Sequence, residues 1–159
     1  MLMNAAEYRE SLRACKPRVF VNGRQVESVA DEPLLAPGVN AIGVTYDFAH
    51  APEHQALMTA RQGTSGKTVN RMLHIDETST DLLHKLEAVR LVCKVSGCAQ
   101  RYLAHDALNG LYQATRRADA VHGTDYHPRF LAYLHEVQER DLTLGIAMTD
   151  AKGDRAKRP

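Results

Sequence analysis

Long stretches with a helical apolar period dominate the second half of the chain and indicate a mainly α-helical fold. The tetrapeptide Thr78-Ser79-Thr80-Asp81 has the composition of a helix N-cap with a reciprocal acid in the first turn. After it, an apolar side chain recurs every three or four positions, which is the period of one helix face. The sequence therefore predicts a long helix that Gly97 interrupts, with apolar positions at Leu82, Leu83, Leu86, Val89 and Cys93.

Two further helices are predicted in the remaining part of the chain. The first spans about Cys98–His122 and stops at Gly123, because glycine adopts the left-handed conformation of a helix C-cap. The second spans Tyr126–Arg140, and Pro128 is tolerated in its first turn. Residues 142–147 are predicted to be extended or loop-like. The expected inner positions are Leu103, Leu108, Leu111 and Tyr112 in the first helix and Phe130, Leu131, Leu134 and Val137 in the second.

The N-terminal part of the chain is predicted to form a helix and then a β-hairpin. Asn4-Ala5-Ala6-Glu7 has the spacing of a capping box, so a helix is expected from there until Pro17. Residues 18–27 form two short runs around Asn22-Gly23. This dipeptide is a strong local hairpin signal, because a type I′ turn needs two residues with positive φ. We therefore expect a small β-hairpin near residues 18–28.

The middle of the chain is divided by proline and glycine. An irregular connection is expected around Pro33, Pro37 and Gly38, because these residues interrupt regular structure. A helix is then predicted over Asn40–His50, and Pro52 restarts another one through Met58. Together with the later helices, these predictions give a mainly α fold with one hairpin.

The Gly/Ser-rich segment over residues 61–71 has no apolar period and is predicted to be a loop. Within it, Gly63–Thr68 is similar in composition to a phosphate-binding loop. The Walker pattern, however, needs a glycine where this chain has Arg61, and a β-strand should come before it. We interpret the segment as a flexible loop, with a binding loop in an assembled enzyme as the alternative.

The overall charge argues against partners that are held by electrostatic attraction. The 20 Lys and Arg residues face 19 Asp and Glu residues, so the formal net charge is +1 and offers no positive field for nucleic acid or anionic membranes. No apolar run reaches the roughly 18 residues of a membrane span. The 3 cysteines are an odd number without a signal-peptide core, which predicts reduced thiols and a cytoplasmic location.

Spacing alone identifies no catalytic or metal site. Cys93 and Cys98 are five positions apart, so on a helix they would point to different faces, and we interpret them as single buried thiols. The 8 histidines are scattered, and Pro52 separates the one pair with helical spacing, His50 and His54. No arrangement of nucleophile, histidine and acid can be assigned from spacing. The residues by themselves predict a helical domain without defined chemistry.

A resemblance to a known family comes from short motifs that occur in one order over nearly the whole chain. The chain resembles the N-terminal portion of the 4-hydroxybutyryl-CoA dehydratase / 4-hydroxyphenylacetate 3-hydroxylase flavoenzymes. The resemblance implies the acyl-CoA dehydrogenase-like architecture, with an N-terminal helical domain (here residues 1–147), a central β-domain and a C-terminal helical bundle. The matching motifs are Glu7-Tyr8, Pro17-Arg18-Val19, Thr45-Tyr46-Asp47, Leu57-Met58-Thr59-Ala60, Asn70-Arg71, Asp106-Ala107-Leu108-Asn109, Gly123-Thr124-Asp125, Asp141-Leu142 and the segment from Ala147 to Arg155.

The family resemblance implies FAD held between the helical domain and the β-domain. Residues 148–159 are then the flavin-lining segment that leads to a β-domain absent from this chain. A threonine hydroxyl and backbone N–H groups can bond the polar edge of the flavin ring, and lysine and arginine can pair with anionic groups. A solvated loop before a domain boundary is the alternative. The cofactor-binding residues implied are Met148, Thr149, Asp150, Ala151 (where relatives usually have proline), Lys152, Gly153, Asp154 and Arg155.

Three positions depart from the family patterns. In the dehydratases, two cysteines four positions apart on one helix face help to ligate a [4Fe-4S] cluster. Cys98 matches the first and is the candidate metal ligand, but Tyr102 stands at the second, and a phenol is a poor replacement for a cluster thiolate. In the hydroxylases these positions hold an arginine and a tyrosine that bind substrate. Tyr102 is therefore the candidate catalytic residue, whereas Ile146 stands where those enzymes have a histidine.

The resemblance leaves three functions open. The first is a flavin-dependent enzyme of the dehydratase type, in which FAD takes part in removing an unactivated β-proton from a hydroxyacyl-CoA. The alternatives are an aromatic hydroxylase that uses reduced flavin and O₂, and a truncated helical domain without catalysis, since the chain ends at Pro159 where the β-domain should begin. The partners implied are an acyl-CoA or phenol substrate, the missing β-domain and C-terminal bundle, and further copies in a homo-oligomer. Nucleic acid and membranes are not expected partners.

Overall fold

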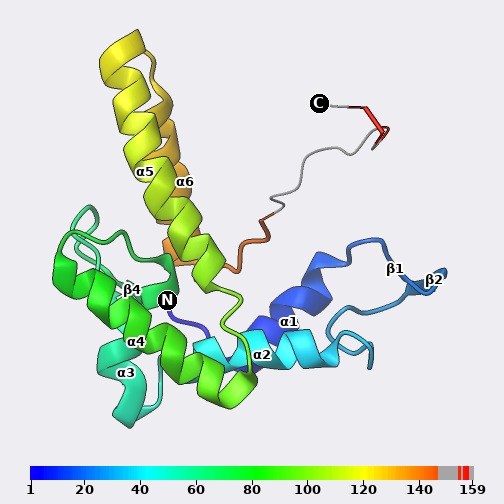
Figure 1. The fold of residues 1–159 in the computed structure, drawn as a ribbon. Helices are drawn as coiled ribbons and strands as arrows, with labels where there is room; N and C mark the ends of the chain where they lie inside the picture. The colour runs from blue at the N-terminus through cyan, green and yellow to red at the C-terminus, as the bar shows by residue number, and fades with distance from the viewer. Residues whose placement is uncertain (147–153, 155, 158–159) are drawn as a thin grey trace.

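The regular structure is mainly helical, as the sequence predicts. The computed structural model describes residues 1–146, 154 and 156–157. Within these residues, helices carry nearly all of the fold, and the four strands are short (Figure 1). The elements are α1 (Ala5–Cys15), β1 (Val19–Val21), β2 (Arg24–Val26), α2 (Ala36–Asp47), α3 (Pro52–Met58), β3 (Thr59–Arg61), β4 (Thr68–Asn70), the 3₁₀-helix η1 (Arg71–Leu73), α4 (Ser79–Ser96), α5 (Tyr102–His122) and α6 (Tyr126–Glu139).

Helix α1 packs against α2 at one end of the molecule. The predicted capping box at the start of α1 is confirmed, since the Asn4 side chain accepts from the backbone N–H of Glu7 and the Glu7 carboxylate accepts from that of Asn4. The β1–β2 hairpin extends beyond both helices (Figure 1). Its turn is the predicted Asn22-Gly23, with φ values of 51° and 77°. The predicted hairpin is confirmed.

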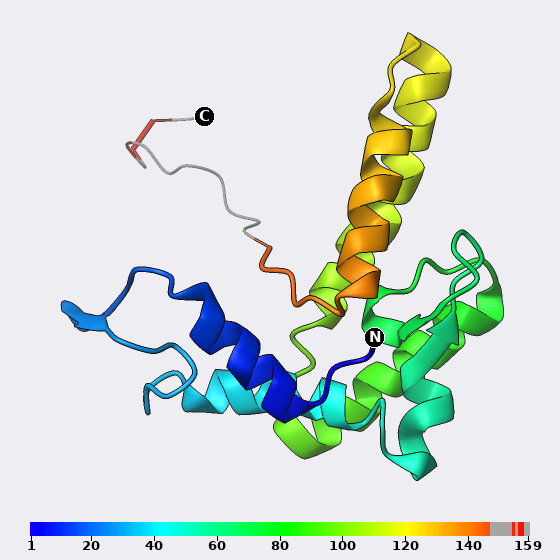
Figure 2. The same ribbon diagram turned by 180° about the vertical axis from the view of Figure 1, so that it is seen from behind.

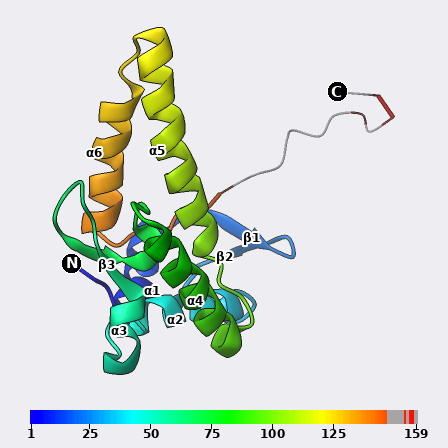
Figure 3. The same ribbon diagram turned by 60° about the vertical axis from the view of Figure 1, so that its left-hand side comes forward.

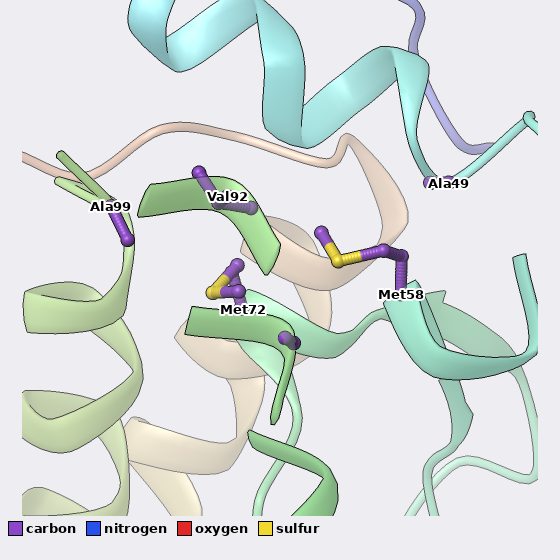
Figure 4. Packing of buried hydrophobic residues seen from close by; sticks show 6 residues of the cluster. Ala49, Met58, Met72, Val92 and Ala99 are labelled. Atoms are coloured by element: carbon purple, nitrogen blue, oxygen red, sulfur yellow. The ribbon is translucent and has the colours of Figure 1, made fainter. Parts of the chain in front are cut away.

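The centre of the molecule is built from α2, α3, α4 and η1. A hydrophobic cluster of buried side chains fills the space between them (Figure 4). The predicted capping box at the start of α4 is confirmed, with Thr78 and Asp81 as its two members. Burial of this cluster stabilises the packing of the central helices. The members of the cluster that Figure 4 labels are Ala49, Met58, Met72, Val92 and Ala99.

Helices α5 and α6 form an antiparallel pair that projects away from the centre (Figures 1 and 3). Gly123 ends α5 with a φ of 64°, as predicted. The Asp119 carboxylate accepts from the first backbone N–H groups of α6, at Tyr126 and His127. No helix among the described residues combines the length and hydropathy that crossing a membrane requires. A second cluster joins this pair to the centre and contains Leu73, Ile75, Leu108, Phe130, Leu134 and Val137.

The prediction of a loop over residues 61–71 is wrong at both ends. Strands β3 and β4 pair antiparallel there, with Thr59 opposite Asn70 and Arg61 opposite Thr68, and η1 follows. The structure thus contains a second small hairpin. The strands were not recognised because each has only three residues and the connection between them lacks an Asn-Gly turn.

Two predicted helix boundaries are also wrong. Helix α5 begins at Tyr102, so Cys98 lies in the connection after α4 and not on a helix. Helix α2 begins at Ala36, because Pro37 occupies the first helical turn, where a missing N–H has no consequence. Pro37 and Gly38 thus belong to α2 and not to the predicted irregular connection.

The apolar period of α4 predicts the helix correctly, but most of its apolar positions do not lie on the face that the helix buries. Leu82, Leu83 and Leu86 are exposed, and Cys93 is exposed as well, whereas Lys85 is buried together with Ala88 and Val92. Leu111 of α5, predicted to be an inner position, is also exposed. The interpretation of Cys93 as a buried thiol is therefore wrong, and Cys98 is only half-buried.

Candidate functional site

The first functional feature is a buried ion pair where the chain leaves α6. Arg101, the N-cap residue of α5, donates from Nη2 to Asp141 Oδ1 at 2.8 Å, and both side chains are 1 % exposed. The same nitrogen donates to the carbonyl of Leu142 at 3.3 Å, and Nη1 donates to Thr45 Oγ1 at 3.3 Å. A buried charge pair is sustained only when further hydrogen bonds complete it. These bonds satisfy the two terminal nitrogens of Arg101, and Asp141 Oδ2 also accepts from the N–H of Met3.

Tyr46 of α2 completes this cluster. The Arg101 guanidinium lies 4.1 Å from the centre of the Tyr46 ring, a cation–π contact. The Tyr46 hydroxyl donates to the carbonyl of Asp141 at 2.8 Å, so the hydroxyl of Thr143, also at 2.8 Å, must donate to Tyr46. Burial raises the pKa of Tyr46, although the nearby Arg101 charge lowers it in part, and the phenol therefore remains a donor. We call Thr45, Tyr46, Arg101, Asp141 and Thr143 the arginine junction.

The backbone at Asp141 turns the chain sharply after α6. Asp141 has a φ of 47°, and the N–H of Leu142 bonds to the carbonyl of Val137 at 3.0 Å, which is the bond pattern of a Schellman motif. The left-handed position of that motif usually holds glycine or asparagine. Here aspartate occupies it because its carboxylate is used, accepting from Arg101 and from the N–H of Met3. The turn sends residues 142–146 past the start of α5 (Figure 2), where residues 143–146 lie beside Gly38 and Ile42 of α2.

A pocket of about 410 Å³ lies beside these residues. One wall is the segment 143–146, and the others come from α2 and from the start of α5. Its apolar side chains include Ile42, Leu103 and Ile146. Arg101 also lines it, and its buried Nε has no hydrogen-bond partner among the residues that the structure describes. The volume lies within the range of about 300–1,000 Å³ that is usual for small-molecule sites.

A second polar cluster lies further along α5, with His105 buried and Asp106 52 % exposed. His105 Nε2 is 3.1 Å from Asp76 Oδ1, and His105 Nδ1 is 3.7 Å from Asp106 Oδ1. Asp106 also accepts from Lys85 Nζ at 2.7 Å, which explains why this lysine of α4 is buried. Burial lowers the pKa of His105 and of His74, so both rings are neutral near pH 7. We call His74, Asp76, Lys85, His105 and Asp106 the histidine junction.

The structure does not bring the two predicted family positions to the pocket. Tyr102 packs against the central hydrophobic cluster, and the pocket lining includes its neighbours Arg101 and Leu103 instead. Cys98 lies before α5, so it does not share a helix face with Tyr102. Among the described residues, no group of three His, Cys, Asp or Glu side chains is arranged to hold a metal ion. The donor set around Cys98 does not fit a cluster that needs several thiolates.

The predicted flavin-lining segment falls mostly outside the described residues. Of Met148 to Arg155, only Asp154 is described, and its carboxylate accepts from the backbone N–H of Ala156 at 3.0 Å. Ile146, the residue found in place of the family histidine, does line the pocket. The pocket therefore lies immediately before the segment to which the sequence assigns flavin binding.

Sequence reasoning did not identify the residues of the arginine junction as a site. Thr45-Tyr46 and Asp141 belong to family motifs, and Arg101 belongs to none of the motifs. An arginine that begins a helix gives no local signal of burial, because its partner follows 40 residues later. The signal that could have found it is the aspartate at position 141, at a helix end that otherwise favours glycine.

Comparison with known proteins identifies the family. The family described as "4-hydroxyphenylacetate 3-hydroxylase N terminal" matches residues 4–159. The 4-hydroxybutyryl-CoA dehydratase/vinylacetyl-CoA-Δ-isomerase of Clostridium aminobutyricum is 39 % identical over 160 residues, covering 100 % of this chain and 33 % of the relative. The oxygenase component of 4-hydroxyphenylacetate 3-monooxygenase from Geobacillus sp. (strain PA-9) is 27 % identical over 95 % of this chain and 31 % of its own length.

Solved structures agree with this assignment. The oxygen-tolerant 4-hydroxybutyryl-CoA dehydratase from N. maritimus superimposes with a TM-score of 0.92 at 40 % identity, over 99 % of this chain and 31 % of its own. The oxygenase component of 4-hydroxyphenylacetate 3-monooxygenase complexed with FAD and 4-hydroxyphenylacetate shares the fold, with a TM-score of 0.76 at 23 % identity over 98 % of this chain and 32 % of its own. The chain thus spans about a third of the length of these proteins. It belongs to the 4-hydroxyphenylacetate 3-hydroxylase N-terminal family, which is represented among its relatives by 4-hydroxybutyryl-CoA dehydratase.

Proposed function

We propose that this chain supplies one wall of the flavin site in an enzyme of the 4-hydroxybutyryl-CoA dehydratase type. The observation that carries the proposal is the 0.92 TM-score at 40 % identity with such a dehydratase, over the whole region that surrounds the pocket. The substrate class is then a hydroxyacyl-CoA. FAD, when bound, supplies the redox chemistry that makes an unactivated β-proton removable.

The described residues fit one side of such a site. The pocket has apolar walls from Ile42, Leu103 and Leu144, which suit a flat ring, and the buried Arg101 is its cationic group. Residues 148–155 follow directly and are the proposed flavin contacts, with Lys152 and Arg155 for anionic groups. One wall alone leaves a flavin ring in water, so affinity requires the rest of the enzyme. The 159-residue chain by itself is expected to purify without colour.

The described residues offer only part of an iron–sulfur site of the dehydratase kind. Cys98 is the one thiol at the family positions, and Tyr102 offers a phenol with its ring against the central cluster. We therefore propose no step that depends on a cluster held at these positions. Cys98 remains the candidate metal ligand, and Tyr102 remains the candidate catalytic residue.

Tyr102 favours the second candidate function, an aromatic hydroxylase that uses reduced flavin and O₂. The monooxygenase relative is 27 % identical over nearly the whole chain, and this chain keeps the tyrosine of the hydroxylase pattern. Ile146 argues in the other direction, because it cannot replace a histidine as a hydrogen-bonding group. The dehydratase type is the better-supported proposal, because both identity and structural agreement are higher with it.

The partners in this proposal are the remaining parts of a larger flavoenzyme. They comprise a β-domain and a C-terminal helical bundle of the acyl-CoA dehydrogenase-like architecture, and further copies in a homo-oligomer. We also propose a cytoplasmic location, in which the three cysteines, an odd number, would stay reduced. The lyase class follows if the reaction is dehydration.

A chimeric enzyme tests the proposal. Residues 1–159 replace the matching N-terminal third of the Clostridium aminobutyricum dehydratase, and flavin absorbance per polypeptide is measured after purification. We expect stoichiometric flavin, and turnover of 4-hydroxybutyryl-CoA rather than hydroxylation of 4-hydroxyphenylacetate. A chimera that folds and binds no flavin would contradict the proposal and leave the non-catalytic helical domain.

The variant Tyr102→Cys in the same chimera tests the assignment of the cluster positions. With a thiol four residues after Cys98, bound iron is expected to rise relative to the unsubstituted chimera. Equal iron content in the two proteins would show that position 102 does not decide cluster binding. The control is Tyr133→Cys, which places a thiol on an exposed side of α6.

A further inference from the structure

We propose that Arg101 is a positioning residue, which holds residues 142–146 as a fixed wall of the pocket through its ion pair with Asp141. This inference rests on the proposed function, because the held segment leads directly to the proposed flavin contacts. It concerns a residue for which neither the family motifs nor the spacing of the sequence suggested a role.

Residues 141–146, which we call the exit segment, are held by the arginine junction at successive positions. Arg101 bonds the carboxylate of Asp141 and the carbonyl of Leu142. Tyr46 bonds the carbonyl of Asp141 and the hydroxyl of Thr143. The exit segment is therefore attached to α2 and α5 at three consecutive positions, before it reaches Leu144 and the pocket wall.

Helix α6 does not need the ion pair between Arg101 and Asp141 in order to end. The Schellman motif alone ends the helix, and glycine or asparagine would serve it at position 141 with less backbone strain. An aspartate there requires a buried counter-charge, which Arg101 provides. The pair sets the direction of the chain after the helix.

Arg101 belongs both to the arginine junction and to the lining of the pocket. Arg101, Thr143 and Ile146 all line the pocket. If residues 142–146 moved away, the pocket would lose one wall, and Arg101 would lose the neighbours that hold it. A planar guanidinium makes several bonds at once, which a lysine ammonium cannot reproduce with the same geometry. The substitution Arg101→Lys therefore keeps the charge and removes the fixed arrangement.

Backbone ¹⁵N relaxation of the 159-residue chain tests the positioning directly. In the unsubstituted chain we expect order parameters of about 0.85 for residues 142–146, as in rigid backbone, and in Arg101→Lys values below about 0.6. Helices α2, α5 and α6 should keep their values. The control Arg140→Lys makes the same chemical change in an exposed pair with Glu136, next to the junction, and should leave the segment rigid.

Tyr46→Phe is the second variant, should Arg101→Lys not fold. It removes the bonds to Asp141 and Thr143 but retains the ring under the guanidinium, and the segment should again lose order. Unchanged order parameters in both variants, or a uniform loss over the whole chain, would overturn the positioning role.

The flavin-loaded chimera gives the functional test. Arg101→Lys is expected to raise the Kd for FAD about tenfold, because a preorganised wall is lost, while Arg140→Lys leaves it unchanged. If Arg101→Lys loosens residues 142–146 but the parent chimera binds no flavin, the proposed function fails and the positioning role stands. If the chimera binds flavin equally well with either residue at 101, the positioning role fails and the proposed function stands.

Discussion

The arginine junction and the histidine junction both hold charged groups near the start of α5, but they differ in burial and in what can neutralise their charges. Arg101 and Asp141 are 1 % exposed and form a pair whose cation cannot lose its proton in proteins. The histidine junction combines Lys85 and two aspartates with a histidine that is neutral near pH 7. One junction is therefore permanently charged, and the other can gain a proton within the pH range of ordinary experiments.

This difference indicates separate tasks for the two clusters. The arginine junction joins the exit segment to α2 and α5. Burying its charges therefore fixes the direction in which the chain leaves α6. The histidine junction joins α4, α5 and the loop after η1, where Asn109 also bonds the carbonyl of His74 and the N–H of Asp76. It fixes how the central helices are packed. The following substitutions test whether the two clusters behave so differently.

Asp141→Asn is expected to have the largest effect on stability. Asparagine tolerates the left-handed backbone at this position, so the change isolates the charge. It leaves the Arg101 cation buried without a counter-charge, which should lower the free energy of unfolding by about 3–5 kcal/mol. Urea unfolding at pH 7 measures the change.

The control for this substitution is Glu136→Gln. It makes the same carboxylate-to-amide change in the exposed pair with Arg140, so its effect should stay within about 0.5 kcal/mol. If Asp141→Asn were as mild as this control, the arginine junction would contribute little and the contrast between the clusters would disappear.

Tyr46→Phe should have the next largest effect. The substitution leaves the buried carbonyl of Asp141 and the hydroxyl of Thr143 without their shared partner. We expect a loss of about 1–3 kcal/mol in the free energy of unfolding. Tyr8→Phe is the matched control, because the Tyr8 ring stacks on the Tyr46 ring at 4.9 Å without a hydroxyl contact to the junction. A loss of equal size in the control would show that the effect does not come from the bonds of the Tyr46 hydroxyl to Asp141 and Thr143.

Acidification should affect the histidine junction before the arginine junction. Burial lowers the pKa values of His74 and His105 in the folded protein, so the unfolded chain binds protons first. Stability is then complete above the unfolded histidine pKa of about 6.5 and falls as the pH drops below it, by at most about 1.4 kcal/mol per pH unit for each histidine. Unfolding midpoints between pH 7.5 and 5 measure this slope.

Two variants separate the source of that slope. His105→Gln removes one of the buried titrating groups and should flatten the dependence on pH. His122→Gln changes an exposed histidine at the end of α5 and should leave it as it is. A slope that stays the same in His105→Gln would mean that this histidine is not the group responsible. Carboxylates whose pKa is lowered in the folded protein, such as Asp81, cause further losses only below about pH 4.

Local chemistry in the sequence predicted most of the helical fold. The caps at Asn4 and Thr78, the Asn22-Gly23 turn and the end of α5 at Gly123 each depend on residues within a few positions of one another. The face of α4 that is buried could not be predicted in this way. Its selection depends on Asp106, 21 residues from Lys85, because that ion pair permits a lysine to be buried while Leu83 is exposed.

The candidate site was predicted less completely, for the same physical reason. Sequence resemblance pointed to Cys98, Tyr102 and residues 148–155, and those assignments remain predictions. The pocket and the arginine junction depend on Arg101 meeting Asp141, which only the packing of α5 against the end of α6 brings about. Neither residue has a spacing or composition signal for burial. The one local signal is Asp141 itself, because an aspartate stands at a helix end that usually holds glycine.

The substitution at Thr143 should have the smallest effect of the series. Thr143→Val removes only the hydroxyl that donates to Tyr46, and valine has nearly the same shape. Because the Tyr46 hydroxyl still donates to the carbonyl of Asp141, no buried donor is left without a partner. The loss should be about 0.5–1 kcal/mol, the net value of one hydrogen bond. Thr59→Val is the control, since the Thr59 hydroxyl donates to the carbonyl of Gln55, four residues earlier, at 2.8 Å and makes no contact with the arginine junction. If Thr143→Val were as costly as Asp141→Asn, the ion pair would not be the dominant contact of the junction. A loss within the predicted range would instead show that the ion pair contributes more to stability than the Thr143 hydroxyl does.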